Sequence, residues 1–346
     1  MRMRIRALLL AAAVGAAGPA ACTACSAPAA GSAAASPAAH APSGGAAPAP
    51  APHGVPADLL PVGTRSETII DHKRGTVARW PQPARPYRVL PTTVFYPAAS
   101  GPTSRGDTPG AEPRRGGYPL VVFAHGFDTN PEIYTPFLHA LALHGYVVAA
   151  PLFPIESFIP GAAAARRSDP EMAAQMDDVS AVIDAIGAWA AQPSHWLHAA
   201  VDPAAVAVVG HSDGATTVGG MTMSSSYRDA RIKAAVVLAG APDPVLSYPG
   251  RRVVPTLVEQ ATEDRYNSPA DAVRLYQSVV GPRAYLSVVG AQHIWPLVGD
   301  DRIADLVRRV VVSHLNMVLK GGGAASRRAM LDAGNQPGYD SLSFAS

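Results

Sequence analysis

Short apolar segments alternate with helix-like segments along most of the chain, and this alternation limits the possible folds more than any other sequence feature. Helices are predicted to begin at Asn130 and Asp169, where a capping or acidic residue precedes a proline and apolar residues then recur at helical spacing. Apolar strands separated by helices are typical of a parallel sheet covered on both faces. The sequence therefore predicts an α/β fold with a mostly parallel central sheet. Its later strands are Leu120–Ala124, Tyr146–Ala150, Val206–Val209, Ile232–Ala239, Thr256–Glu259 and Tyr285–Val289.

The two ends of the predicted domain are less regular than its middle. Glu67–Asp71 and Tyr87–Tyr96 are predicted strands, and Pro91 in the second indicates a sheet edge or a break. A closing helix is predicted over Arg302–Leu319, and three glycines follow it. The folded domain is therefore expected to span residues 57–320, and residues 321–346 are expected to form a polar tail.

The first 25 residues have the pattern of a secretory signal. A basic start is followed by a short apolar run, Ala7–Ala17, which is too short to span a membrane. The only cysteines of the chain, Cys22 and Cys25, come just after it, and Ala20-Ala21-Cys22 resembles the end of a bacterial lipoprotein signal. Lipid attachment at Cys22 and ordinary cleavage nearby both remain open. Either interpretation predicts an exported protein, secreted or anchored to the cell envelope.

Residues 26–56 are predicted to be a disordered linker. Of these 31 positions, 28 are Ala, Pro, Gly or Ser, so the segment cannot bury enough apolar surface to offset its chain entropy. Because no cysteine follows Cys25, the remaining chain has neither an internal disulfide nor a thiolate metal site.

A glycine-rich pentapeptide lies between a predicted strand and a predicted helix. Gly210-His-Ser212-Asp-Gly214 follows Val206–Val209 directly, and a helix-like segment comes next. A tight turn of this kind needs glycine at both outer positions and projects the serine hydroxyl from the sheet beside a helix N-terminus. The arrangement predicts that Ser212 is a nucleophile; the alternative is a structural glycine turn.

An activated serine needs a base, and the base needs an acid that orients it. In this type of fold the chain order is serine, acid, histidine. Only two histidines follow Ser212: His314 lies inside the closing helix, whereas His293 lies in a loop after the last predicted strand. His293 is therefore the predicted base. Among seven carboxylates between Ser212 and His293, Asp264 is the predicted acid because it follows a late strand, with Asp243 as the alternative.

Acyl transfer also requires backbone donors for the developing oxyanion. The N–H of Asp213, which follows the nucleophile, is one predicted donor. The second is the N–H of Phe127, in the loop His125-Gly126-Phe127 that follows an early strand. The predicted oxyanion hole therefore joins two strand ends of the sheet.

Together these segments resemble the α/β-hydrolase superfamily across residues 60–320. Within it the chain is similar to cutinase-like polyester hydrolases and to bacterial platelet-activating-factor-acetylhydrolase-like esterases, through YPLVVFAHGF, HGYVVAAP, GHSDG, PTLVEQATED and GAQH. The resemblance implies Ser212 as nucleophile, His293 as base and Asp264 as acid, the last because the acetylhydrolase position near Gly240 has no carboxylate. It also implies Phe127 and Asp213 as backbone donors.

Two positions depart from the polyester-hydrolase pattern. Asp213 stands where an uncharged residue is commoner, so we expect its carboxylate to turn away from the oxyanion. The segment AGAPDP after Ile232–Ala239 lacks the tryptophan that stacks on aromatic substrates, which argues against a preference for aromatic polyesters.

The predicted function is therefore an exported serine hydrolase that cleaves carboxylic esters. Gly240–Val254, about fifteen residues, is too short for a large cap domain, so an open cleft is expected, lined in part by Tyr134 and Trp295. No metal or organic cofactor is required, the partner is a small-molecule, lipid or polymer ester, and a monomer is expected. A net charge of +2 argues against nucleic-acid binding by bulk charge. A non-catalytic envelope binding protein, or a peptidase or thioesterase with the same triad, remains an alternative.

Overall fold

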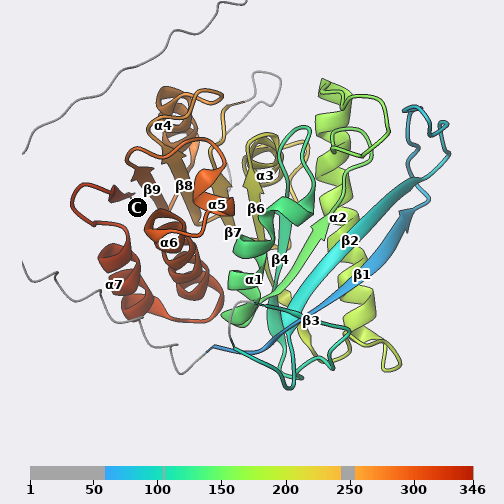
Figure 1. The fold of residues 1–346 in the computed structure, drawn as a ribbon, viewed down its shortest axis with the longest axis horizontal. Coiled ribbons are helices and arrows are strands. Elements are labelled where there is room, and N and C mark those ends of the chain that lie inside the picture. The colour runs from blue at the N-terminus through green and yellow to red at the C-terminus, as the bar shows by residue number, and fades with distance from the viewer. Residues whose placement is uncertain (1–58, 104–105, 243–253, 346) are drawn as a thin grey trace, which may run out of the picture. The chain divides into compact units, whose positions relative to one another are not determined.

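Ten strands form one sheet in the computed structural model, which describes residues 59–103, 106–242 and 254–345 (Figure 1). The predicted signal and linker, Cys22 and the alternative acid Asp243 lie outside the described residues. The strands are β1 (Val62–Asp71), β2 (Arg88–Pro97), β3 (Thr108–Pro109), β4 (Tyr118–Ala124), β5 (Val147–Pro151), β6 (Val201–His211), β7 (Ile232–Leu238), β8 (Thr256–Ala261), β9 (Arg283–Val288) and β10 (Asp340–Ala345). The helices are η1 (Pro131–Tyr134), α1 (Thr135–Leu143), α2 (Asp169–Ala191), α3 (Asp213–Met223), α4 (Pro269–Ser278), α5 (Trp295–Val298), α6 (Arg302–Leu319) and α7 (Gly323–Ala333).

The centre of the sheet is parallel, as the apolar strands predict. The strand order is β10-β9-β8-β7-β6-β4-β5-β2-β1-β3, and every neighbouring pair from β5 to β9 is parallel. β2 runs antiparallel to β5, and β1 runs antiparallel to β2. The loops after β4, β6, β8 and β9 therefore all leave the sheet at the carboxyl ends of its strands, where ligands of open α/β sheets usually bind.

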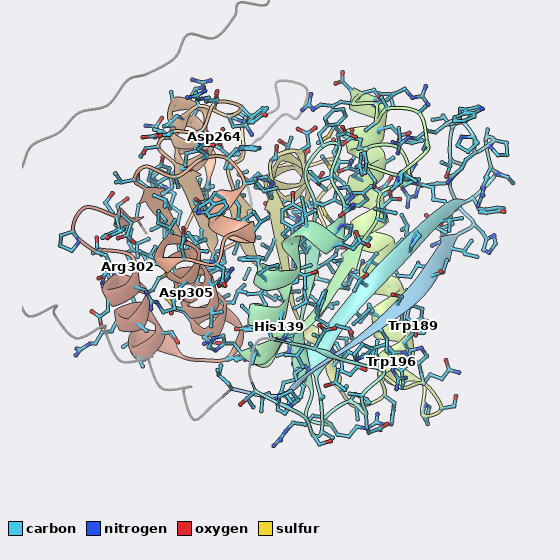
Figure 2. The ribbon with its side chains drawn as sticks, viewed as in Figure 1. His139, Trp189, Trp196, Asp264, Arg302 and Asp305 are labelled. Atoms are coloured by element: carbon cyan, nitrogen blue, oxygen red, sulfur yellow. The ribbon has the colours of Figure 1, made fainter. Side chains whose placement is uncertain are left out.

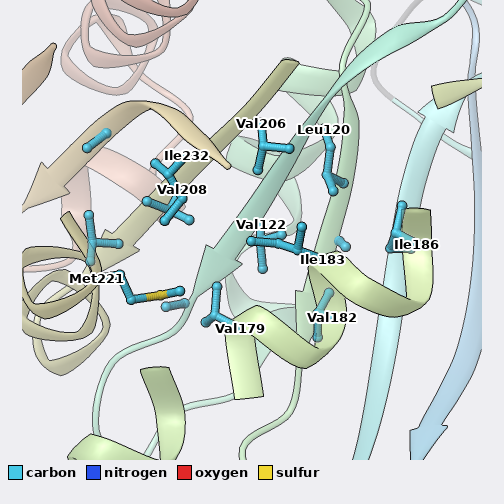
Figure 3. Close-up of a cluster of buried hydrophobic side chains, with 14 of the residues drawn as sticks. Leu120, Val122, Val179, Val182, Ile183, Ile186, Val206, Val208, Met221 and Ile232 are labelled. Atoms are coloured by element: carbon cyan, nitrogen blue, oxygen red, sulfur yellow. The ribbon is translucent and has the colours of Figure 1, made fainter. Parts of the chain in front are cut away.

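Helices cover both faces of the sheet, as predicted. α2, α3 and α4 pack on one face, whereas α1, α5, α6 and α7 pack on the other. Figure 3 shows the first contact in detail, with Val179, Val182, Ile183 and Ile186 of α2 facing Leu120 and Val122 of β4 and Val206 and Val208 of β6. These side chains are at most 4% exposed, so α2 fixes the position of the central strands. No separate cap domain is present among the described residues.

Pro91 does not mark a sheet edge or a break, contrary to the sequence prediction. β2 is continuous and lies between β1 and β5. Its pairing with β5 covers Thr92 to Phe95 only, so Pro91 falls just outside that ladder. A strand can accept a proline there because no ladder hydrogen bond to β5 needs its missing N–H.

The predicted polar tail is wrong, because most of residues 321–346 belong to the folded domain. Gly321 has a φ of 65° and ends α6 as expected, but α7 and β10 follow it. Met330 and Ala333 of α7 and Leu342 of β10 are buried, and β10 pairs antiparallel with β9. Few apolar residues occur in this segment, and they become buried only against α6 and β9.

A buried ion cluster ties α2 to the first two strands. Arg88 and Asp178 are 1% and 0% exposed. The Arg88 Nε and Nη2 atoms donate to the two Asp178 oxygens at 2.7 Å each, and Arg74 Nη2 donates to Oδ1 at 2.8 Å. Both oxygens of Asp178 are thus paired with guanidinium groups inside the protein.

We expect Asp178→Asn to lower the free energy of unfolding by about 3 to 5 kcal/mol, because buried Arg88 then keeps only the more distant Glu171 carboxylate, 3.4 Å away, as its counter-charge. Asp177→Asn is the matched control. The Asp177 side chain is 56% exposed and its carboxylate lies as far as 4.0 Å from Arg74, so its loss should lower the free energy of unfolding by less than about 1 kcal/mol. Urea denaturation of the two variants measures the difference. Equal effects would show that the buried pair contributes no more than a surface pair.

Candidate active site

The turn around Ser212 has a strained backbone at the end of β6. Ser212 has φ 56° and ψ −118°, and α3 begins at the next residue. A Cβ on Gly210 would lie 2.1 Å from the Gly214 carbonyl oxygen, and one on Gly214 would lie 2.1 Å from that of Ala124. Only glycine fits at both positions, so the pentapeptide has the strand–turn–helix geometry expected for an exposed nucleophile.

His293 and Asp264 are brought together by the loops after β9 and β8. Nδ1 of His293 lies 2.6 Å from Oδ2 of Asp264. Burial raises the pKa of the Asp264 carboxyl, but hydrogen bonds from His293 and from the N–H groups of Asn267 and Tyr266 together hold it below its ordinary value. Asp264 therefore stays ionised at neutral pH and can orient the imidazole with its Nδ1 proton towards the carboxylate.

Gln260 positions Asp264, and Tyr266 flanks His293. The sequence alone predicted a role for neither residue. Gln260 Nε2 donates to Oδ2 of Asp264 at 2.9 Å, so this oxygen binds both Gln260 and His293. The Tyr266 ring lies 5.0 Å from the His293 ring and is 82% exposed. Asp264 itself lies beside α4, where β8 leaves the sheet (Figure 2). No sequence pattern distinguishes Gln260 or Tyr266 from ordinary strand and loop residues.

A chain of hydrogen bonds connects the three segments of the site. The Gly126 N–H donates to the Tyr134 hydroxyl at 3.3 Å, this hydroxyl lies 2.9 Å from His211 Nδ1, and His211 Nε2 lies 3.1 Å from the carbonyl oxygen of His293. Burial, and secondarily the neighbouring His293, lower the pKa of His211 to about 3. A neutral His211 with its proton on Nε2 satisfies both contacts. The residue before Ser212 therefore fixes the loop of the predicted base.

The predicted role of Tyr134 as a substrate-lining residue is wrong. Its side chain is 0% exposed, packs against Phe123 and forms the internal link just described. The N-terminal end of α1 folds this ring inward, which the helical spacing alone does not reveal. Trp295, in contrast, is 48% exposed, and its Nε1 donates to Asp301 Oδ2 at 2.7 Å.

The loop that carries Phe127 passes directly over the turn at Ser212. A Cβ on Gly126 would lie 3.1 Å from the Ser212 Cβ, so glycine permits this close approach. The Thr129 hydroxyl donates to the Gly126 carbonyl oxygen, and the Asp128 N–H donates to the Glu156 carbonyl oxygen, both at 2.7 Å. The Phe127 N–H makes no hydrogen bond within the part of the chain that the structure describes. It is therefore available to a ligand.

The Asp213 carboxylate pairs with Arg167. Arg167 Nε donates to Asp213 Oδ2 at 2.7 Å. The guanidinium therefore offsets the negative charge of the carboxylate that was expected to turn away from the oxyanion. Glu156 lies nearby and is almost fully buried; burial, and then the charge of Asp213, raise its pKa to about 8. A neutral Glu156 and a paired Asp213 limit the negative potential beside Ser212.

Glu259 gives the site a second buried carboxyl with a raised pKa. It is 2% exposed, and its Oε1 has no hydrogen-bond partner among the described residues. Burial, and then the charge of Asp264, raise its pKa from 4.5 to about 8. Between pH 4.5 and about pH 8, Glu259 therefore keeps its proton in the folded protein but loses it in the unfolded chain. The free energy of unfolding falls as the pH rises through this range.

We expect Glu259→Gln to remove part of that pH dependence and to be more stable than the wild type near pH 8, because no carboxylate has to be ionised inside the protein. Urea denaturation between about pH 5 and about pH 8 measures the slope. Glu263→Gln, at an exposed position in the same segment, should keep the wild-type slope. An unchanged slope in Glu259→Gln would mean that Glu259 is not the titrating group.

Comparisons with known proteins agree with this architecture. A family model described as chlorophyllase matches residues 110–258, which include the turn at Ser212 but end before Asp264 and His293. A solved structure of a ferulic acid esterase from Streptomyces cinnamoneus matches with a TM-score of 0.61 and 21% sequence identity, over 84% of this chain and 98% of that one. A search of curated protein sequences finds no match. The sheet order, the strained serine turn and these two likenesses together show that the chain has an α/β-hydrolase fold.

Proposed function

We propose that the protein hydrolyses carboxylic esters through a covalent acyl-enzyme on Ser212. The observation that carries this proposal is the 2.6 Å contact between His293 Nδ1 and Asp264 Oδ2, beside the strained turn of Ser212. An ionised acid that orients an imidazole close to a partly exposed serine is the arrangement required for nucleophilic acyl transfer. The family match and the structural likeness to an esterase support ester bonds as the target.

In the proposed mechanism, Ser212 Oγ attacks the ester carbonyl carbon while His293 Nε2 accepts the hydroxyl proton. The N–H groups of Phe127 and Asp213 bind the oxygen that becomes negative, and Asp264 stabilises the imidazolium. His293 then donates the proton to the leaving alkoxide, and the alcohol departs. A water molecule, deprotonated by His293, attacks the acyl-enzyme and releases the carboxylic acid and free Ser212.

Exposed apolar side chains around the site favour esters with a hydrophobic or aromatic group. Tyr266, Trp295 and Phe127 are 82%, 48% and 39% exposed and belong to the loops that carry the acid, the base and a backbone donor. We propose that these residues contact the substrate. The ferulic acid esterase likeness makes hydroxycinnamate esters a suitable first test.

The test is labelling with a fluorophosphonate probe, followed by hydrolysis assays on matched esters, thioesters and peptide amides. We expect stoichiometric labelling of one serine, ester hydrolysis well above that of the amide, and a lower KM for methyl ferulate than for methyl acetate. Preference for the amide or the thioester would replace the esterase proposal by the peptidase or thioesterase alternative. A folded protein without labelling or turnover would instead favour the non-catalytic binding protein.

We propose further that residues 1–25 direct export and that Cys22 carries a lipid that holds the domain at the cell envelope. The basic start, the apolar run and the Ala-Ala-Cys sequence support this proposal. Expression of the full chain and of Cys22→Ser in a bacterial host tests it. Loss of membrane association in Cys22→Ser, but not in the wild type or in the control Cys25→Ser, would support lipid attachment. Equal release of the wild type and both variants from the membrane would contradict it.

A further inference from the structure

The connection between β1 and β2 folds into a hairpin at the active-site end of the sheet. The two strands pair up to Asp71 and Arg88, and antiparallel bridges continue the pairing within residues 72–87, the β1–β2 hairpin. β2 begins beside the carboxyl end of β5, because Thr92 pairs with Pro151, the last residue of β5. The hairpin therefore extends from the sheet at the same end as the loops of the candidate active site, beyond β1 and β2 in Figure 1.

Hydrogen bonds brace this hairpin against the loop that follows β5. The Arg79 side chain is buried, and its Nε and Nη2 atoms donate to the Ala163 carbonyl oxygen at 3.0 and 2.9 Å. The Ala163 N–H donates in turn to the Trp80 carbonyl oxygen at 2.7 Å, and Arg166 Nη2 donates to the Ala78 carbonyl oxygen at 2.6 Å. These contacts fix the tip of the hairpin relative to the sheet.

The side chain at the braced tip is apolar and faces solvent. Trp80 is 72% exposed, and its indole nitrogen has no hydrogen-bond partner among the residues that the structure describes. Val77 of the same hairpin is 53% exposed, and Phe158 of the bracing loop is half exposed. Large apolar side chains held in water on a fixed element are unfavourable, and such groups commonly mark a contact surface.

The charge around the tip is positive. Residues 72–87 contain one lysine and three arginines but no acidic residue. Arg79 and Arg166 donate to carbonyl oxygens and Arg85 lies over a tyrosine ring, and none of the three pairs with a carboxylate in the described part of the chain. Burial lowers the pKa of Arg79, and the Asp128 carboxylate on the neighbouring loop offsets this only in part. An anionic partner would complement this charge.

We propose that the tip of the β1–β2 hairpin docks on the surface of a lipid bilayer that contains anionic phospholipids. An indole ring suits the boundary between headgroups and acyl chains, because it is apolar and carries one N–H donor. Guanidinium groups beside the ring pair with the phosphates of the headgroups. None of the described helices is long and apolar enough to cross a bilayer.

A fluid bilayer suits this tip better than a folded protein does. Trp80 lies at the end of a hairpin, so a protein partner would need a preformed pocket for its ring, whereas lipids rearrange around it. Because the hairpin lies at the carboxyl ends of the strands, docking also turns the candidate active site towards the bilayer. The docking depends neither on the proposed ester hydrolysis nor on a lipid at Cys22.

Co-sedimentation with vesicles tests the proposal, using the full chain with Cys22→Ser so that no lipid at that position contributes to binding. We expect vesicles of phosphatidylcholine with about one-third phosphatidylglycerol to bind the chain at least about tenfold more tightly than phosphatidylcholine alone. Val77→Glu, which places a carboxylate at the docking surface, should weaken binding to the anionic vesicles by at least about tenfold.

Val280→Glu is the matched control for Val77→Glu. Val280 is 43% exposed and precedes β9, so it lies at the opposite end of the sheet. The two substitutions change the net charge equally, and Val280→Glu should bind the vesicles like the parent chain. Arg166→Gln, which keeps a donor for Ala78, should weaken binding to the anionic vesicles by about fivefold and leave binding to phosphatidylcholine unchanged.

The fluorescence of Trp80 provides a second measurement. Trp80→Phe keeps a ring at the tip, so the difference between the two emission spectra reports this residue among the four tryptophans of the chain. We expect phospholipids brominated on their acyl chains to quench the difference signal. Circular dichroism should show that each variant keeps the fold, because the substituted side chains are exposed.

Three results would overturn the proposal. Equal binding of Val77→Glu and Val280→Glu, or vesicle binding without quenching of Trp80, would show that the chain contacts the bilayer through another surface. A folded chain that binds neither kind of vesicle would assign the hairpin tip to a protein or polymer partner instead.

Discussion

Ser212→Ala is expected to lower kcat for ester hydrolysis by about 10^4-fold to 10^6-fold. The variant lacks the oxygen that forms the acyl-enzyme, whereas the histidine, the acid and the backbone donors remain. Alanine has the same backbone requirements as serine at a φ of 56°, so the free energy of unfolding should change little. Initial rates on a fluorogenic ester and thermal denaturation measure the two quantities separately.

The loss should coincide with loss of fluorophosphonate labelling, and peptide mapping of the labelled wild type should identify Ser212 alone. Ser66→Ala, at an exposed position of β1 remote from the turn, is the control and should retain both activity and labelling. Substantial turnover in Ser212→Ala, together with normal folding, would show that another residue is the nucleophile.

Asp264→Asn is expected to lower kcat by about 10^4-fold, the size of effect found when an amide replaces the acid of a catalytic triad. Oδ2 of Asp264 accepts from His293 Nδ1 and from Gln260 Nε2. An amide NH2 in that position would donate to Nδ1 and favour the tautomer that has its proton on Nε2, which cannot act as a base towards Ser212. Binding of substrate should be affected much less than turnover.

Single-turnover and steady-state kinetics separate these two effects. Glu263→Gln is the matched control, because it removes a neighbouring exposed carboxylate. Asp243→Asn tests the alternative acid, which lies outside the described residues. Near-normal turnover in Asp264→Asn combined with loss in Asp243→Asn would transfer the role of the acid to Asp243.

The parts of the fold that could be predicted are those in which local pattern and burial coincide. Strands such as Val206–Val209 are apolar throughout because helices cover both faces, so composition alone reveals them. α7 and β10 lack such a pattern: Leu342 is buried only because β10 pairs with β9, and this contact joins distant parts of the chain. Pairing between distant strands leaves little trace in the sequence of either strand alone.

The candidate site shows the same division. The glycines of the pentapeptide are required by steric contacts within a few residues and with one neighbouring strand, so the turn at Ser212 could be predicted. Tyr134 could not be placed correctly, because its burial depends on the approach of His211 and Phe123 from other strands. Gln260 and Tyr266 acquire their positions only once Asp264 and His293 have met.

The final strand also determines how the sheet meets other molecules. With β10 in place, β9 is an interior strand, and the backbone groups on its outer side are paired within the chain. The Val289 N–H, just beyond β9, donates to the Tyr339 carbonyl oxygen at 2.7 Å, which extends this protection towards the loop of His293. An unpaired β9 would offer a template for a strand of another molecule. By pairing with β9, the C-terminal segment thus prevents a strand of another molecule from pairing with β9 next to the His293 loop. Such pairing is the first step of edge-to-edge aggregation.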